Sequence, residues 1–260
     1  MAVYTTIDDA GSFYNTLLYT GNASTINVTG VGFQPDLCWV KEYASAEAQT
    51  WYDAVRGATY RIRSNTDAAQ DTESSGLTSF DADGFTSGQQ GGTNSDGGTY
   101  VSWNWKAGTT SGLTGGTITP SAYSISTTAG QSVIAYTGTG SAATVPHGLG
   151  VAPSLIITKS LVATQEWCVY HKVLGATKYM FLNETSAAGT GSAYYNDVEP
   201  TSTLFTIGTA GPTNSSSAMI AYCFAPVKGY SKMGGYTGNA NADGTFVYTG
   251  FRPAFVLIKH

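Results

Sequence analysis

The sequence predicts an all-β protein made of tandem β-sandwich modules, jelly-roll-like in character, with two modules complete and a third truncated. Three observations lead to this prediction. A ten-residue motif is repeated three times, turn sequences such as DADG, NSDGG and NADG are frequent, and the stretch VSWNWK alternates apolar and polar residues. Short strands between closely spaced turns are typical of sandwiches, and a fixed repeat marks a duplicated unit.

The ten-residue motif places a glycine, a proline and a lysine at constant spacing around an apolar run. Glycine allows the turn, and proline fixes φ just before a strand, where no ladder N–H is lost. An uninterrupted apolar run of this length favours a strand that is covered on both faces. The copies read GFQPDLCWVK, GVAPSLIITK and GFRPAFVLIK, with their defining residues at Gly32, Pro35 and Lys41, at Gly150, Pro153 and Lys159, and at Gly250, Pro253 and Lys259.

Similarity between the first two copies continues past the motif. A nearly constant offset over many residues indicates that each copy is one structural unit. The pairs that lie 118 residues apart include Lys41 and Lys159, Val55 and Val173, and Asn65 and Asn183. Near the end of each copy the offset becomes 119, and it aligns Trp103 with Tyr222 and Trp105 with Phe224.

The repeats divide the chain into five segments. The third copy lacks a counterpart of the later part of the repeat, so we expect the native chain to extend beyond residue 260. Tandem β-modules predict an elongated, rigid rod or knob. The predicted segments are an N-terminal arm (1–11), module 1 (12–108), a Gly/Thr/Ser linker (109–129), module 2 (130–228) and the start of an incomplete module 3 (229–260).

The stretch VSWNWK predicts a half-buried strand near the end of module 1. Because side chains alternate along a strand, one face should be apolar and the other polar. Residues 65–77 form the one segment whose composition admits a short helix. The predicted apolar face carries Val101, Trp103 and Trp105, and the polar face carries Ser102, Asn104 and Lys106.

The low charge of the chain excludes several classes of partner. Charged residues make up 11% of the sequence, against about 25% in an average soluble domain. The net charge is -5 and no cluster of five or more Lys and Arg occurs, whereas nucleic-acid binding requires phosphate neutralisation. No apolar run approaches the roughly 18 residues of a membrane span, and the N-terminus lacks the features of a signal peptide. We expect no nucleic-acid partner and no membrane insertion.

Residues with reactive side chains do not form a pattern typical of catalysis. His147 lies in a turn sequence, and His171 occupies the repeat position of Asp53, which has different chemistry. The three cysteines lie in apolar runs, which predicts buried thiols rather than disulfides or a zinc site. We therefore expect no catalytic residue, no cofactor and no metal. The cysteines are Cys38, Cys168 and Cys223.

Two acidic patterns favour structural roles. Asp81–Gly84 resembles the start of a calcium loop, but the position of the bidentate glutamate is Gly92. We therefore predict a turn there, with a shallow cation site as the alternative. Asp53 and Arg56 are close enough in sequence to form a salt bridge.

Aromatic residues near predicted loops leave one binding function open. The flat faces of such rings can stack on planar sugar faces, although most of the 17 tyrosines should serve packing. The candidate glycan contacts are Trp51, Tyr52, Tyr194 and Tyr195.

The motifs together resemble a family of repeat proteins encoded by tailed bacteriophages, especially those of marine bacteria. The resemblance spans nearly the whole chain and implies a virion structural or tail-fibre-like protein. It brings no catalytic residues with it. The motifs that carry it are YTGN…GFQPDLCWVK, DAVRGAT, SFDADGF and YVSWNWKAG in the first copy, YTGTGSAATVPHGLGVAPSLIITK and VYHKVLGATKYMFLN in the second, and ADGTFVYTGFRPAFVLIK in the third.

We therefore expect a phage structural protein, either a tail-fibre or appendage subunit or a capsid-decoration subunit, that acts by self-association and surface display. Its partners would be copies of itself, as a homo-oligomer, and other virion proteins. Its location would be the virion, assembled in the host cytoplasm and exposed on the extracellular particle. The alternative is a lectin-like adhesin that binds a host surface glycan.

Overall fold

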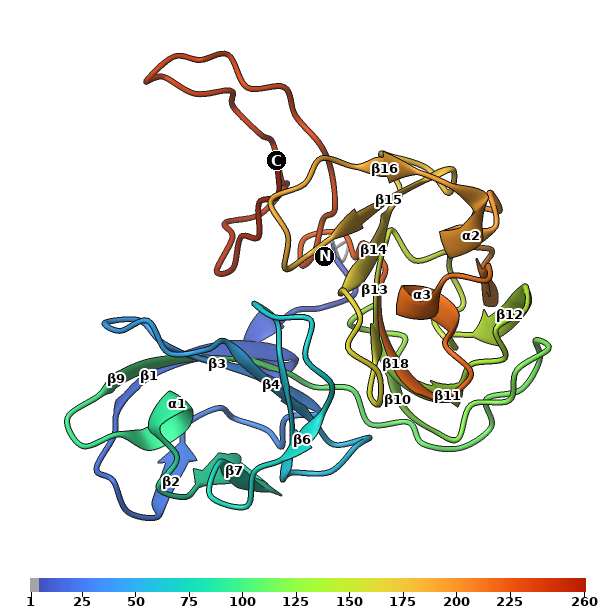
Figure 1. The fold of residues 1–260 in the computed structure, drawn as a ribbon. Coiled ribbons are helices and arrows are strands. Elements are labelled where there is room, and N and C mark those ends of the chain that lie inside the picture. The colour runs from blue at the N-terminus through green and yellow to red at the C-terminus, as the bar shows by residue number, and fades with distance from the viewer. Residues whose placement is uncertain (1–4) are drawn as a thin grey trace.

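Antiparallel β-strands make up nearly all of the regular structure of residues 5–260, the part of the chain that the computed structural model describes (Figure 1). The prediction of an all-β sandwich fold is therefore confirmed. Of the predicted N-terminal arm, residues 1–4 lie outside the described residues. Further along the arm, the 3-10 turn η1 (Ala10–Ser12) is capped by the side chain of Asp9.

The first half of the chain, residues 12–108, contains a large and a small sheet. Gly32 of the motif has a φ of 84° in the turn that leads to β3, a conformation that favours glycine. The large sheet has the order β1 (Tyr14–Thr20), β9 (Thr99–Trp105), β3 (Leu37–Glu42), β4 (Thr50–Asp53), β5 (Tyr60–Arg63) and β6 (Asp71–Thr72). The small sheet has the order β2 (Ile26–Thr29), β8 (Gly84–Ser87) and β7 (Leu77–Asp81), and the one-turn helix α1 (Gly91–Asn94) follows β8.

The second half, residues 130–228, has the same plan. Gly150 repeats the positive φ of Gly32, at 73°. The large sheet has the order β10 (Ala122–Ser126), β11 (Gln131–Thr137), β18 (Ala218–Phe224), β13 (Leu155–Ser160), β14 (Cys168–His171), β15 (Lys178–Phe181) and β16 (Gly189–Thr190). Of these strands, β10 comes from the preceding segment, residues 109–129. The small sheet pairs β12 (Ala143–Pro146) with β17 (Leu204–Ile207), and the one-turn helices are α2 (Ser192–Tyr195) and α3 (Gly211–Asn214).

Six strands of the large sheet follow the same order in both halves. In turn, β1, β9, β3, β4, β5 and β6 correspond to β11, β18, β13, β14, β15 and β16. The registers also agree, since Lys41 pairs with Val101 and Lys159 pairs with Ile220. The exact module boundaries, 12–108 and 130–228, stay a prediction, because the two halves share part of their core.

Three apolar clusters fill the spaces between the sheets. One lies between the large and small sheets of the first half, and a second lies between those of the second half. The third joins the two large sheets and includes Leu37 and Trp51 from one half and Trp167 and Tyr222 from the other. The halves therefore lie side by side with their large sheets in contact (Figure 1), and are not strung end to end as a rod would require.

The central strands are covered on both faces. For β3 and β13 this confirms the prediction from their apolar runs, since each has only one residue outside the buried class. For β9 the predicted alternation is present, but the polar face is the buried one and the apolar face is partly exposed. Ser102 and Asn104 on its polar face are 0% exposed, because that face lies toward the small sheet, while the face with the tryptophans lies toward the second half.

The segment between the halves is more ordered than its Gly/Thr/Ser composition predicts. Within residues 109–129, β10 pairs with β11, and Thr109 forms an isolated bridge with Ile125. Ile118 and Ile125 are buried in the core of the second half. Burying these two side chains stabilises the segment against the sheet, which composition alone does not reveal.

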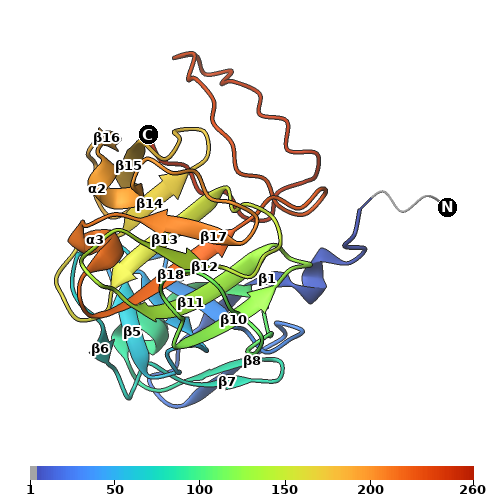
Figure 2. The same cartoon turned by 90° about the vertical axis from the view of Figure 1, so that its right-hand side faces the viewer.

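Residues 229–260 contain no helix or strand. The segment begins with a turn closed by a bridge between Val227 and Ser231 and then projects as a long loop (Figure 2). The strand-like runs predicted there are therefore not paired. The short helix considered for residues 65–77 is also absent, since that segment forms turns and β6.

Candidate functional site

An aromatic cluster joins the two large sheets, and its centre is Trp51 on β4. The Trp51 ring lies 4.9 Å from Trp39 of its own half, measured between centroids. It lies 5.2 Å from Trp167 and 4.9 Å from Tyr222, both in the other half. Tilted and edge-on pairs at these distances are favourable for aromatic rings. The interface between the halves is therefore a packed, apolar core.

A buried ion pair lies beside this cluster. Arg56 Nε donates to Asp53 Oδ2 at 2.6 Å, and Tyr222 Oη donates to the same oxygen at 2.7 Å from the other half. The predicted salt bridge between Asp53 and Arg56 is thus confirmed. Burial opposes the charge of Arg56, but the neighbouring carboxylate of Asp53 outweighs it and raises the pKa of the guanidinium. Through Tyr222, the ion pair is hydrogen-bonded to the other half.

The motif lysine of the second half makes a further contact across the interface. Lys159 is 0% exposed, and its Nζ donates to the backbone oxygen of Asp67 at 3.2 Å and to that of Ser160 at 2.9 Å. Burial lowers the pKa of Lys159 to about 8. Next to it, Trp167 Nε1 donates to the backbone oxygens of Arg63 and Thr66 at 2.9 and 3.1 Å. The end of β5 and the loop that follows it therefore accept hydrogen bonds from side chains of the second half.

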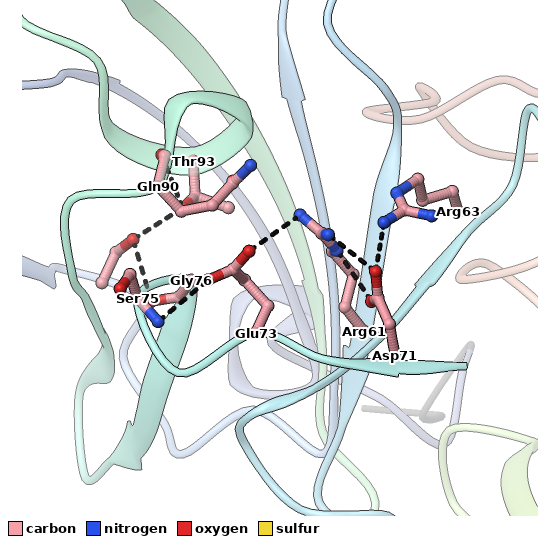
Figure 3. A network of polar contacts seen from close by, with 9 residues as sticks. Arg61, Arg63, Asp71, Glu73, Ser75, Gly76, Gln90 and Thr93 are labelled. Carbon is pink, nitrogen blue, oxygen red and sulfur yellow. Dashed lines mark hydrogen bonds and ion pairs between the residues drawn. The ribbon is translucent and has the colours of Figure 1, made fainter.

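An ion-pair network lies near the surface of the first half, at β5 and β6 (Figure 3). Asp71 accepts from Arg61 at 2.8 Å and also from Arg63, and Arg61 reaches Glu73 at 3.5 Å. Partial burial disfavours the charge on Asp71, but the two arginines outweigh it and lower the pKa of the carboxyl. Glu73 in turn accepts from the backbone N–H of Ser75 at 3.1 Å (Figure 3). The network ties the edge strands to the following turn.

Two buried asparagines, Asn94 and Asn214, have the same role in the two halves, which was not predicted from the sequence. Asn94 donates to the backbone oxygens of Ser24 and Gly88. Asn214 donates to those of Ser141 and Gly208, both at 2.6 Å. Each side chain also accepts from a backbone N–H in the turn after an equivalent strand, β1 for Asn94 and β11 for Asn214. The TN sequence shared by GGTNS and GPTNS could have predicted that the two asparagines are equivalent.

The reactive residues singled out in the sequence have structural surroundings. The three cysteines are free and buried, and burial raises the pKa of each thiol. His147 is buried and lies between the backbone N–H of Leu149 and the backbone oxygen of Thr201. Its pKa is lowered by burial. His171 accepts from the backbone N–H of Val173 at 3.2 Å.

The stretch Asp81–Gly84 forms the tight turn between β7 and β8, as predicted. Asp83 accepts from the backbone N–H groups of Gly30 and Gly32 at 3.0 and 2.6 Å. Asp81 accepts from the hydroxyls of Ser79 and Thr86. Both carboxylates are thus used by neighbouring donors, which favours the turn over the alternative of a cation site.

The proposed glycan contacts do not form a sugar-binding surface. Trp51, Tyr52 and Tyr195 are at most 2% exposed, so their ring faces are closed to a ligand. Tyr194 is partly exposed, but it stacks on Tyr179 at 3.5 Å and packs against the core. Trp51 and Tyr52 lie on β4, Tyr194 and Tyr195 lie on α2, and the apolar area of these rings is used for packing.

Two small grooves open at the rims of the interface between the halves. One has a volume of about 240 Å³ and is lined in part by Trp39, Asn65, Asn183 and Lys259. The other has a volume of about 320 Å³ and is lined in part by Arg56. The residues that line the two grooves include no Asp, Glu or His.

Two further observations apply to residues 5–260. No three His, Cys, Asp or Glu side chains among them are grouped so that they could hold a metal ion. No helix in this range has both the length and the apolar character needed to cross a membrane.

The fold and these contacts define an all-β sandwich protein whose two halves share one strand order and pack on each other through their large sheets. The chain belongs to a family described as a domain of unknown function (DUF7483), which matches residues 9–260. The matched region runs through both halves and the third copy of the motif. No curated protein and no solved structure gives a match.

Proposed function

We propose that the chain is a structural subunit of a bacteriophage particle, in a tail fibre, an appendage or a capsid decoration, that acts by association of its repeats and by surface display. The resemblance of its motifs to phage repeat proteins supports the virion setting. The low proportion of charged residues, 11%, supports a role on an extracellular particle.

The observation that carries this proposal is the contact between the two large sheets. Two copies of one repeat pack through Trp51, Trp167 and Tyr222, and the lysine of one copy bonds the loop of the other. A repeat that uses its large sheet to bind another copy of the same repeat is suited to assembly. The buried cysteines and the engaged histidines also support a structural role over a catalytic one.

The third copy of the motif adds to this support. Val256 and Ile258 are each 64% exposed, whereas their repeat equivalents Cys38 and Val40 are fully buried. Exposed apolar side chains in a row mark a surface that other protein covers. Such a segment favours association over independent action.

Labelling of intact particles tests the virion setting. An antibody raised against the folded chain should decorate purified particles of the phage that encodes it, and electron microscopy should show the label on the tail or on the head. Particles that lack both the label and peptides of the chain in mass spectrometry would contradict the proposal. The same images would separate a fibre or appendage from a capsid decoration.

A further inference from the structure

In each copy of the motif, the lysine shares one face of the apolar run with two other residues. The three copies differ in what covers this face. In β3, alternation places Leu37, Trp39 and Lys41 on the face away from the small sheet, and the first two belong to the cluster between the large sheets. In β13 the equivalent residues are Leu155, Ile157 and Lys159. In the third copy they are Phe255, Leu257 and Lys259.

The motif lysines of the second and third copies each donate a hydrogen bond to a loop of the preceding copy. Lys159 donates to the backbone oxygen of Asp67, two residues after Asn65. Lys259 donates to the backbone oxygen of Glu184, the residue after Asn183. We call these two segments, residues 65–67 and 183–185, the asparagine loops.

The two asparagine loops are built alike. Asn65 accepts from the backbone N–H of Gln49 at 3.2 Å, and Asn183 accepts from the backbone N–H of Trp167 at 3.0 Å. The contact from the second copy to the first is therefore repeated from the third copy to the second.

The third copy also touches the first. The ring of Phe255 lies 6.2 Å from Tyr14, 6.0 Å from Trp39 and 5.5 Å from Trp105. These rings are on the large-sheet face of the first half, beside the area that the second half covers. Each of the three copies thus contacts the other two, as the members of a closed ring do. Two of the three lysine contacts of such a ring are present, and the one from the first copy to the third is not.

The lysine that would make the missing contact is Lys41, the motif lysine of the first copy. Among residues 5–260, its Nζ donates only within its own hairpin, to the backbone oxygens of Glu42 and of Ser45, the latter at 2.8 Å. By register, Lys41 lies beside Val101, and Val101 lies beside Leu18. We call these three residues the lysine surface of the first half.

The same surface is covered in the second half. There the register places Lys159, Ile220 and Ala135 side by side, and the first two are 0% exposed. In the first half Leu18 is 71% exposed, and Val101 is partly exposed. One surface of the repeat is therefore closed in the second copy and open in the first.

We propose that the lysine surface binds the asparagine loop of a third β-sandwich of this same repeat, in which residues 255–260 form the strand equivalent to β3 and β13. Lys41 then donates to a backbone oxygen of that loop, as Lys159 does to Asp67, and the loop covers Leu18. The surface continues the interface already present between the halves and has the same apolar and cationic chemistry. The proposal rests on this interface and not on the virion role.

A longer chain that contains a third sandwich, called the completed chain below, tests this proposal. Because Lys259 is equivalent to Lys159, residues 1–259 followed by a second copy of residues 160–228 provide all strands of a third sandwich. Acetylation read by mass spectrometry reports the accessibility of each lysine. In the 260-residue chain, Lys41 should react readily and Lys159 slowly. In the completed chain, Lys41 should react at least about tenfold more slowly, a degree of protection typical of local burial, while exposed Lys106 should be unchanged.

A variant on the lysine surface gives the second readout. Leu18→Glu should leave the melting temperature of the 260-residue chain unchanged and lower that of the completed chain by several degrees. The matched control is Val198→Glu, at another exposed apolar residue (44% exposed), which should not distinguish the two chains. In a second completed chain, residues 42–106 follow Lys259 in place of residues 160–228. This chain serves as a replacement if the first one does not fold.

Two outcomes would overturn the proposal. One is a Lys41 that stays reactive in both completed chains. The other is a dimer of the 260-residue chain, seen by sedimentation velocity, that protects Lys41 and is broken by Leu18→Glu. In that case a second copy of the chain occupies the surface, which would leave the association role intact and exclude the third sandwich.

Discussion

Trp51 and Trp167 lie in different halves of the chain, yet their rings are only 5.2 Å apart. Trp51 is on β4, and Trp167 directly precedes β14, the repeat equivalent of β4. Both are at most 2% exposed. The pair shows that the two copies of the repeat meet through equivalent parts of their large sheets.

Truncation of Trp167 should destabilise the whole chain. Trp167→Ala removes a fully buried ring and its two hydrogen bonds to the other half, and we expect a loss of about 3–5 kcal/mol in the free energy of unfolding. Urea unfolding followed by circular dichroism measures it. Tyr43→Ala, at a residue that is 56% exposed, is the control. A Trp167→Ala chain as stable as this control would show that the interface is not packed as described.

The two buried asparagines should prove equivalent. Asn94→Ala and Asn214→Ala each leave backbone groups without partners, so each should lower the free energy of unfolding by about 1–3 kcal/mol. Asn241→Ala, at an exposed residue in the C-terminal loop, should change it by less than about 0.5 kcal/mol. The measurement is again urea unfolding. If only one of the two variants is destabilised, the two halves do not use these residues alike.

The three thiols should react only after unfolding. Cys38, Cys168 and Cys223 are buried and free, and burial keeps each thiol protonated because it raises the pKa. A disulfide-exchange reagent added to the native chain at neutral pH should label none of them, and in denaturant it should label all three. Rapid labelling of the native chain would show that the cores around β3, β14 and β18 are open.

Lys159 should make stability rise with pH over a defined range. Its pKa falls from 10.5 in the unfolded chain to about 8 in the folded one, mainly because of burial. Between these values the unfolded state binds more protons, so the contribution of this lysine grows as pH rises from about 8 to about 10.5. The slope should be about 1.4 kcal/mol per pH unit.

A difference measurement isolates this effect from the cysteines and tyrosines that titrate in the same range. The free energy of unfolding of the native chain minus that of Lys159→Met should increase from pH 8 to pH 10. The same difference for Lys106→Met, at an exposed lysine, should stay constant. A difference that is flat for Lys159 would contradict its burial against the loop of the first half.

The repeat motif made part of this fold predictable. The part that could not be predicted depends on contacts between residues far apart in the sequence. Gly32 and Gly150 lie in left-handed turns, and the apolar runs after Pro35 and Pro153 are strands covered on both faces. These features depend on local sequence. What covers the second face is a long-range property, so the docking of the large sheets through Trp51 was not predicted.

The candidate site shows the same limit. Asp53 and Arg56 are close in sequence, and their ion pair could be predicted. The hydroxyl of Tyr222 that completes it comes from a residue far along the chain. Trp51 and Tyr195 looked like ligand contacts because aromatic rings suit both packing and binding, and only burial distinguishes the two.

Hydrogen exchange at the indole N–H of Trp167 tests the central claim, that the two copies of the repeat share one core, most directly. This N–H belongs to the second half, and its acceptors, the backbone oxygens of Arg63 and Thr66, belong to the first. In a two-dimensional NMR spectrum, with the signal assigned by Trp167→Phe, it should exchange at least about a thousandfold more slowly than a free indole. Complete exchange within the first spectrum, while the backbone amides of β13 and β18 remain protected, would contradict the shared core.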